Sequence, residues 1–214
     1  MQSSKAKTIG YWATTGIVVL IFGPGAVSDL IQAPEAVAFI GAIIDFAGSF
    51  GAPAIIGSMQ GRWAGPVHRD QAVTWLRDAL DQLSPRAKAF NVPVLIEPLN
   101  RYETNLLHSV ADGLALLKGL QTQNVKLLVD LFHANIEEAS IADALRLAGP
   151  DLGHVHFVDS NRQAAGFGHT DYAPIAEALR EIAYEGFLSA EVLPLPDSDS
   201  AAAQTMTSFR KWFR

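Results

Sequence analysis

The sequence predicts an α/β protein of the (β/α) TIM-barrel type, incomplete at its N-terminal side, with about six βα units. Short β-branched apolar runs alternate along the chain with longer segments of helical periodicity. The runs are apolar on both faces, which is typical of parallel strands covered by helices. No GxGxxG motif follows the first run, which argues against a doubly wound dinucleotide fold. A closed barrel has eight strands in about 250 residues, so a 214-residue chain with six such runs looks incomplete.

The expected elements alternate regularly. The strands are expected at 17–22, 53–58, 92–97, 125–130, 153–158 and 187–192. The helices are expected at roughly 34–50, 68–90, 108–120, 138–148, 171–184 and 199–212. Pro34 and Ser109 suit helix starts, and Gly51 and Gly149 lie between a helix and the next strand, where an αβ loop often takes glycine. Residues 1–15 stay poorly defined, because 8–13 fits either a short strand or a helix end.

Composition excludes several classes of protein. With 49% hydrophobic and 18% charged residues, the chain suits one globular domain, residues 1–214. Its longest apolar stretch breaks at residues 23–25 (Gly-Pro-Gly), and its start lacks a signal peptide's apolar centre, so we expect a cytoplasmic protein with no membrane partner. Without cysteine there can be neither disulfides nor thiolate metal sites. The net charge of −6 argues against a nucleic-acid partner.

Four consecutive predicted strands carry, at or near their carboxyl ends, residues able to bind a metal. These are Glu97, Asp130, His156 and Glu191, separated by 33, 26 and 35 residues, or about one βα unit each time. In a parallel barrel the carboxyl ends of all strands meet at one rim, where active sites lie. Three carboxylates and an imidazole would need a cation between them, and this ligand set suits Mn²⁺, Mg²⁺ or Co²⁺ better than a structural zinc.

Each of these residues also has an ordinary structural interpretation. A single acidic residue at a strand end is most often a helix N-cap or a solvated loop residue. His154 and His156 share one face of their strand and fit buried core histidines as well as ligands. Four such endings on consecutive units are hard to attribute to chance, so the set favours a metal site.

More polar groups follow the same strand ends and could hold a polyhydroxylated ligand. They are Asn100, Arg101, Glu103, His133, Asp159, Asn161 and Arg162. The two arginines could instead pair with Glu103 or Asp159, and for Arg101 we prefer that structural role. Aromatic residues on the predicted loops could pack on a sugar or simply anchor the loops; these are Trp63, Tyr102, Phe132 and Phe167.

Four segments resemble the xylose-isomerase-like TIM barrel superfamily, and within it most of all the D-tagatose and D-psicose 3-epimerase group. They are EPLNRYE (97–103), DLFHANIEE (130–138), GHVHFVDSNR (153–162) and SAEV (189–192). The resemblance runs from about residue 16 to the C-terminus. It implies one divalent metal, Mn²⁺ first and Mg²⁺ or Co²⁺ next, bound by the four strand-end residues. It also implies that Glu103, His133 and Arg162 contact a ketose.

The resemblance further implies a metal-dependent sugar isomerase or epimerase. Epimerisation of a ketose at C3 would pass through an enediolate, with Glu97 and Glu191 as the acid and base. Other enzymes of the superfamily remain open, namely a hydroxypyruvate isomerase or a dehydratase-type lyase, as does a catalytically impaired barrel acting as a binding module. An endonuclease IV activity is disfavoured, because that enzyme uses a three-zinc site rich in histidine. This chain has only six His in total.

The sequence departs from the family at its front. Members carry two more βα units before the run at 17–22, and no segment here matches them. Their absence would leave open sheet edges, which need cover. We therefore expect a homo-oligomer.

Overall fold

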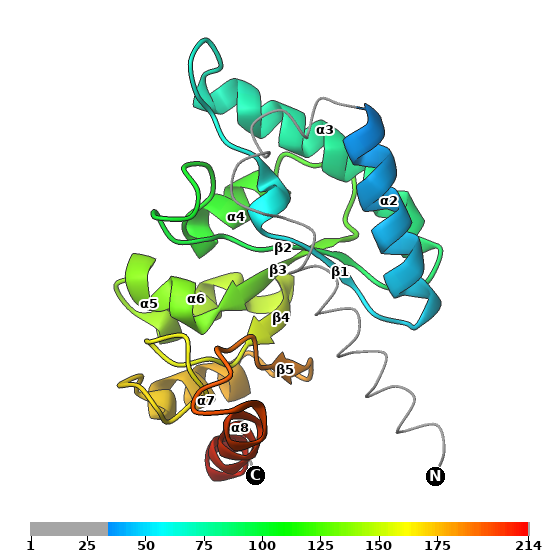
Figure 1. The fold of residues 1–214 in the computed structure, drawn as a ribbon. Coiled ribbons are helices and arrows are strands. Elements are labelled where there is room, and N and C mark those ends of the chain that lie inside the picture. Colours follow the sequence, from blue (N-terminus) through cyan, green and yellow to red (C-terminus); the bar gives the residue numbers. More distant parts are fainter. Residues whose placement is uncertain (1–33, 214) are drawn as a thin grey trace. The chain divides into compact units, whose positions relative to one another are not determined.

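The computed structural model describes residues 34–213, in which strands and helices alternate (Figure 1). All five strands predicted within this range are present, and the predictions at 17–22 and for residues 1–15 lie outside it. Most strands are shorter than the apolar runs that contain them. They are β1 (Ala54–Ile56), β2 (Val94–Ile96), β3 (Val125–Asp130), β4 (Leu152–His156) and β5 (Leu188–Ser189).

The six predicted helices are also present, with ends shifted by a few residues at most. They are α2 (Pro34–Ser49), α3 (Arg69–Lys88), α4 (Val110–Leu117), α6 (Ile141–Ala148), α7 (Tyr172–Glu181) and α8 (Ser198–Phe213). The sequence missed one helix, α5 (Leu131–Glu137), which begins directly after β3. Short 3₁₀ turns add η1 (Ser58–Gln60) and η2 (Gly149–Asp151). None of the helices described in 34–213 has the length and apolar character that crossing a bilayer requires.

The chain divides into two compact units, and the prediction of a single domain stays a prediction. The described part of one unit comprises residues 34–95 with Gly119–Val125. In its described part α2 packs against α3, with Ile44, Leu76 and Leu80 almost fully buried. An exposed ion pair between Arg86 of α3 and Asp45 of α2 crosses the same two helices.

The described part of the second unit comprises Ile96–Lys118 with residues 126–213. Here β3 pairs in parallel with β4, and β4 with β5, so that Asp130 lies beside His156 and His156 beside Ser189. Helix α6 packs on α4, α5 and α7, and α7 packs on α8 (Figure 1). Leucines 127, 128 and 145 are completely buried between these layers. A well-packed core therefore supports the carboxyl ends of the strands in this unit.

Candidate metal centre

The four predicted metal ligands lie together in the second unit. Asp130 and His156 are the last residues of β3 and β4. Glu97 comes directly after β2, and Glu191 lies two residues after β5. Each offers one ligand atom, and these atoms all lie within 4.8 Å of one another. The parallel register thus brings together residues spread over more than 90 positions of the chain.

The spacing of these atoms fits a divalent cation. His156 Nδ1 lies 3.1 Å from Asp130 Oδ2, 3.1 Å from Glu191 Oε2 and 3.6 Å from Glu97 Oε1. Neighbouring ligands of an octahedral ion bound at about 2.1 Å are about 3 Å apart. Three carboxylate oxygens and one imidazole nitrogen suit Mn²⁺ or Mg²⁺ and related ions. The assignment of these residues as metal ligands stays a prediction, and the arrangement is compatible with it.

The electrostatics show how closely these groups depend on one another. Burial opposes charge on His156, but hydrogen bonds with Asp130, Glu191 and Glu97 hold its pKa well above the usual value. Burial raises the pKa of Glu97, and the His156 hydrogen bond only partly offsets this. Burial also acts on Asp130, yet hydrogen bonding and charge from His156 lower its pKa to about 2. A positive charge between these carboxylates therefore stabilises their ionised forms.

The three residues predicted to contact a ketose surround the same point. Arg162 Nη2 lies 2.9 Å from Glu191 Oε2, and its Nη1 lies 3.1 Å from His133 Nε2. His133 is buried, with Nε2 3.9 Å from Glu97 Oε1 and Nδ1 3.8 Å from Glu103 Oε1. The guanidinium of Arg162 also lies over the ring of Phe132, 5.0 Å from its centroid. All seven predicted site residues thus belong to one cluster.

Arg162 is held by an ordered loop, residues 159–170. Its own backbone has a φ of 61°, a left-handed conformation that is uncommon for a non-glycine residue. The buried carboxylate of Asp159 accepts hydrogen bonds from the backbone N–H of Ser160 (2.8 Å), Gly166 (2.7 Å) and Thr170 (3.0 Å). On the far side, Leu193 N–H donates to Arg162 O at 2.7 Å. The loop therefore fixes Arg162 next to the segment that carries Glu191.

Replacing Asp159 with asparagine is expected to loosen this loop. Burial raises the pKa of Asp159, but the backbone N–H donors outweigh burial and lower the pKa to about 2. A depressed carboxyl pKa contributes stability that is fully present above the unfolded value of about 4 and is lost as pH falls towards 2. We expect Asp159→Asn to lower the free energy of unfolding by about 1–2 kcal/mol at pH 7, since the amide oxygen can still accept from some of the backbone N–H groups.

Urea unfolding of the wild type and the variant at pH 7 and pH 3 measures this difference. The difference between the two proteins should be clearly smaller at pH 3 than at pH 7, because it disappears only as the pH approaches the folded pKa of about 2. Asp171→Asn, at the N-cap of α7, serves as a control that leaves the loop intact. Equal stability of wild type and Asp159→Asn at pH 7 would contradict the role of the carboxylate.

Arg101 does not have the partner that the sequence suggested. It pairs neither with Glu103 nor with Asp159 but with Glu137, at the end of α5. Glu137 accepts hydrogen bonds from the backbone N–H of Arg101 (2.6 Å), from Nε (2.9 Å) and from Nη2 (2.9 Å). Arg162 likewise pairs with Glu191 and Asp130 rather than with Asp159. The Arg101–Glu137 clamp fastens the loop after β2, which carries Glu103, to α5, which carries His133.

Glu137→Gln is expected to release this loop. The amide keeps the shape of the side chain but loses the charge that binds the guanidinium, and bidentate charged pairs are the stronger hydrogen bonds. We expect amide hydrogen exchange in residues 98–107 to become about tenfold faster. Glu181→Gln is a matched control, because Glu181 binds Arg146 in an exposed pair on α6 and α7. Unchanged exchange in Glu137→Gln would refute the clamp.

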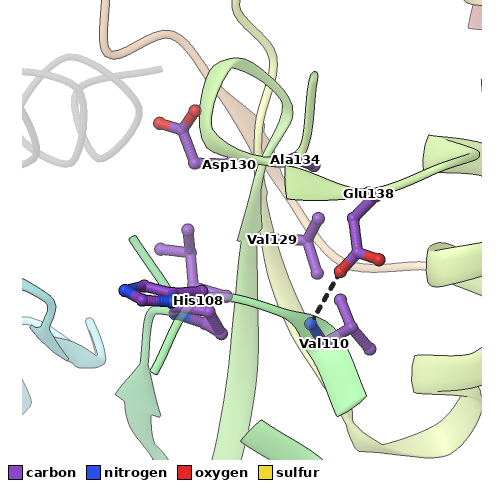
Figure 2. A pocket seen from close by; sticks show the side chains of 8 residues that line it. His108, Val110, Val129, Asp130, Ala134 and Glu138 are labelled. Atoms are coloured by element: carbon purple, nitrogen blue, oxygen red, sulfur yellow. Dashed lines mark hydrogen bonds between the residues drawn. The ribbon is translucent and has the colours of Figure 1, made fainter. Parts of the chain in front are cut away.

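A small pocket beside the site has a structural role. A pocket between α4, β3 and α5 is lined mainly by apolar residues, with Val129 and Asp130 on opposite sides of β3 (Figure 2). Its two other polar residues bond to backbone. Glu138 accepts from the N–H of Val110 at 2.8 Å, and His108 Nε2 contacts Thr104 O at 3.0 Å. The hydrogen bond between Glu138 and Val110 joins the start of α4 to the residue that follows α5.

The two histidines of β4 have different surroundings. His156 belongs to the candidate metal centre, whereas His154 Nε2 contacts Ser189 Oγ of β5 at 2.7 Å. Burial first, and the charge of His156 second, lower the pKa of His154 to about 3. His154 is thus a neutral core histidine that links β4 to β5. The sequence left both interpretations open for this pair.

Sequence reasoning did not assign roles to three residues that organise the site. Asn100 lies between His133 and Glu103, Glu137 clamps Arg101, and Asp159 orders the loop of Arg162. In the sequence, Asn100 and Asp159 stand out only as polar residues near strand ends. The role of Glu137 could not be recognised from the sequence, because its partner Arg101 lies 36 positions away and helix α5 was not predicted.

Comparisons with known proteins identify the family of the chain. The family model described as "Xylose isomerase-like TIM barrel" matches residues 6–212. The chain is 34% identical over 193 residues to a D-psicose 3-epimerase of Agrobacterium fabrum, covering 85% of this chain and 64% of the relative. It is 41% identical over 125 residues to an L-ribulose 3-epimerase of Mesorhizobium japonicum, covering 58% of this chain and 41% of the relative.

A solved structure supports the same fold. The crystal structure of a D-psicose 3-epimerase in the presence of D-fructose matches with a TM-score of 0.77 at 27% identity, covering 89% of this chain and 76% of that one. The chain spans less than two thirds of the length of the two curated relatives. The predicted TIM-barrel fold class is confirmed by the family match and by this structural likeness. The chain belongs to the xylose isomerase-like TIM barrel family.

Proposed function

We propose that this chain is a metal-dependent ketose 3-epimerase. The observation that carries the proposal is the convergence of Glu97, Asp130, His156 and Glu191 at the ends of successive strands. The names of the relatives, D-psicose 3-epimerase and L-ribulose 3-epimerase, point to the same chemistry on a small sugar. The metal is proposed to be Mn²⁺, with Mg²⁺ or Co²⁺ as substitutes, because oxygen-rich ligand sets favour these ions.

Glu97 and Glu191 are proposed to move the protons. A divalent cation bound by the four residues would polarise the ketone oxygen of the sugar and so acidify the neighbouring C–H. One glutamate removes the C3 proton, and the electrons of the broken C–H bond pass towards the ketone oxygen to give an enediolate. The other glutamate delivers a proton to the opposite face of C3, which inverts that centre and restores the ketone.

Three other residues are proposed to hold the sugar. Arg162 and His133 direct nitrogen atoms to the edge of the metal centre, and Glu103 lies beside them with about half of its side chain exposed. Such groups orient hydroxyl and carbonyl oxygens by hydrogen bonds. The cytoplasmic location and the homo-oligomeric state stay predictions.

A screen of free and phosphorylated ketoses with Mn²⁺ present tests the function. We expect at least one ketose to exchange its C3 proton in D₂O and to yield its C3 epimer, measured by NMR. A protein that binds Mn²⁺ but exchanges no C3 proton would be a binding module instead. Exchange that yields an aldose or a dehydrated product would identify an isomerase or a lyase.

A further inference from the structure

Asn100 connects two of the residues proposed to hold the sugar. It is buried, with 1% of its surface exposed, and follows β2 on the loop that Arg101 clamps. Its side-chain Nδ2 lies 2.8 Å from Glu103 Oε1 and 2.7 Å from His133 Nδ1. Its backbone N–H also points to His133 Nδ1, at 3.3 Å. One buried amide thus touches both neighbours.

The orientation of the Asn100 amide is fixed by its neighbours. The side-chain Oδ1 accepts a hydrogen bond from the N–H of Tyr102 at 3.0 Å, while Nδ2 faces the carboxylate of Glu103. A flipped amide would set oxygen against a carboxylate oxygen and nitrogen against an N–H, so both contacts would become repulsive. The two N–H bonds of Nδ2 are therefore directed to Glu103 and to His133.

This orientation decides which nitrogen of His133 carries the proton. An amide nitrogen and a backbone N–H can only donate, and both point to His133 Nδ1, whereas a single donor, Arg162 Nη1, faces Nε2; Nδ1 is therefore the favoured acceptor. In a neutral imidazole the proton then lies on Nε2. Glu103 Oε1, at 3.8 Å, is too far from Nδ1 to compete as an acceptor for a proton there.

His133 Nε2–H in turn faces Arg162 Nη1 at 3.1 Å, and neither of these groups can accept a hydrogen bond. Two donors therefore converge at the edge of the metal centre, which is an arrangement suited to an oxygen atom of a ligand. We propose that Asn100 is a positioning residue that fixes the tautomer of His133, so that His133 and Arg162 both donate to one oxygen of the sugar. This inference rests on the proposed function for the identity of the ligand.

Nitrogen NMR of ¹⁵N-histidine-labelled protein tests the tautomer without substrate or turnover. The His133 signals are assigned by their loss in His133→Gln. We expect Nδ1 without a proton and Nε2 with one in the wild type, and the reverse in Asn100→Asp, whose carboxylate accepts from Nδ1–H. Glu103→Gln should keep the wild-type tautomer, because Asn100 is intact in it.

A proton on Nδ1 in the wild type overturns the proposal, and this result does not require Asn100→Asp to fold. A tautomer unchanged in Asn100→Asp, or altered in Glu103→Gln, overturns it as well. In the ketose assay we expect Asn100→Asp to raise KM about tenfold, with a smaller change in kcat. Because the NMR reading is independent of catalysis, an inactive wild type would refute the proposed function while leaving the tautomer assignment in place.

Discussion

Glu191→Gln is expected to abolish epimerisation while leaving the fold intact. The side chain lies beyond the end of β5 with 32% of its surface exposed, so it contributes little to the core. Glutamine keeps an oxygen that can still face the cation, but it can no longer accept and release a proton. Loss of a proton-transfer group costs about 10²- to 10⁴-fold in rate, and we expect the upper end because Glu191 is also a proposed metal ligand.

Exchange of the ketose C3 proton in D₂O measures the loss, and metal content measured on the same samples separates two causes. Retained Mn²⁺ with lost exchange assigns proton transfer to Glu191. Lost Mn²⁺ assigns it a mainly ligating role. Glu185→Gln is the matched control, since Glu185 is an exposed residue shortly before β5. Wild-type turnover by Glu191→Gln would refute the proposed mechanism.

The position of the candidate site could be predicted because parallel strands impose it. Residues that end successive strands must meet at one edge, so residue type and a spacing of one βα unit suffice to identify Glu97, Asp130 and His156. The end of the last strand was less predictable. Its apolar run was expected to reach 192, but β5 stops at Ser189, and the N–H of Leu193 donates to Arg162 O. Glu191 reaches the cluster from a loop rather than from a strand.

The supporting contacts could not be predicted, for two physical reasons. Helix α5 has only seven residues, too few to show a clear helical period, and Asp130 starts it by capping rather than by amphipathic pattern. Glu137, the partner of Arg101, and His133, one partner of Asn100, lie more than 30 positions away along the chain. Hydrogen bonds of this kind depend on how loops and helices pack, and no local pattern encodes them.

Substitution of Asp130 is expected to have the other large effect, on metal affinity. The two carboxylate oxygens of Asp130 make different contacts. Oδ1 caps α5, accepting from the N–H of Phe132 at 2.8 Å and of His133 at 3.2 Å. Oδ2 faces His156 Nδ1 at 3.1 Å and Arg162 Nη1 at 3.4 Å. In the variant Asp130→Asn, the amide oxygen can keep the cap while the NH₂ group turns to the metal centre. We therefore expect Mn²⁺ affinity to fall by at least about 100-fold while α5 stays formed.

Asp130→Ala separates the two tasks of the side chain. It should lose the metal to the same degree and in addition lose the cap, which lowers the free energy of unfolding by about 1 kcal/mol relative to Asp130→Asn. Titration with Mn²⁺ followed by calorimetry measures the first effect, and urea unfolding without metal measures the second. Mn²⁺ binding by Asp130→Asn at wild-type affinity would exclude Asp130 from the ligands. Equal stability of the two variants would show that the cap contributes nothing, which the two backbone hydrogen bonds to Oδ1 argue against.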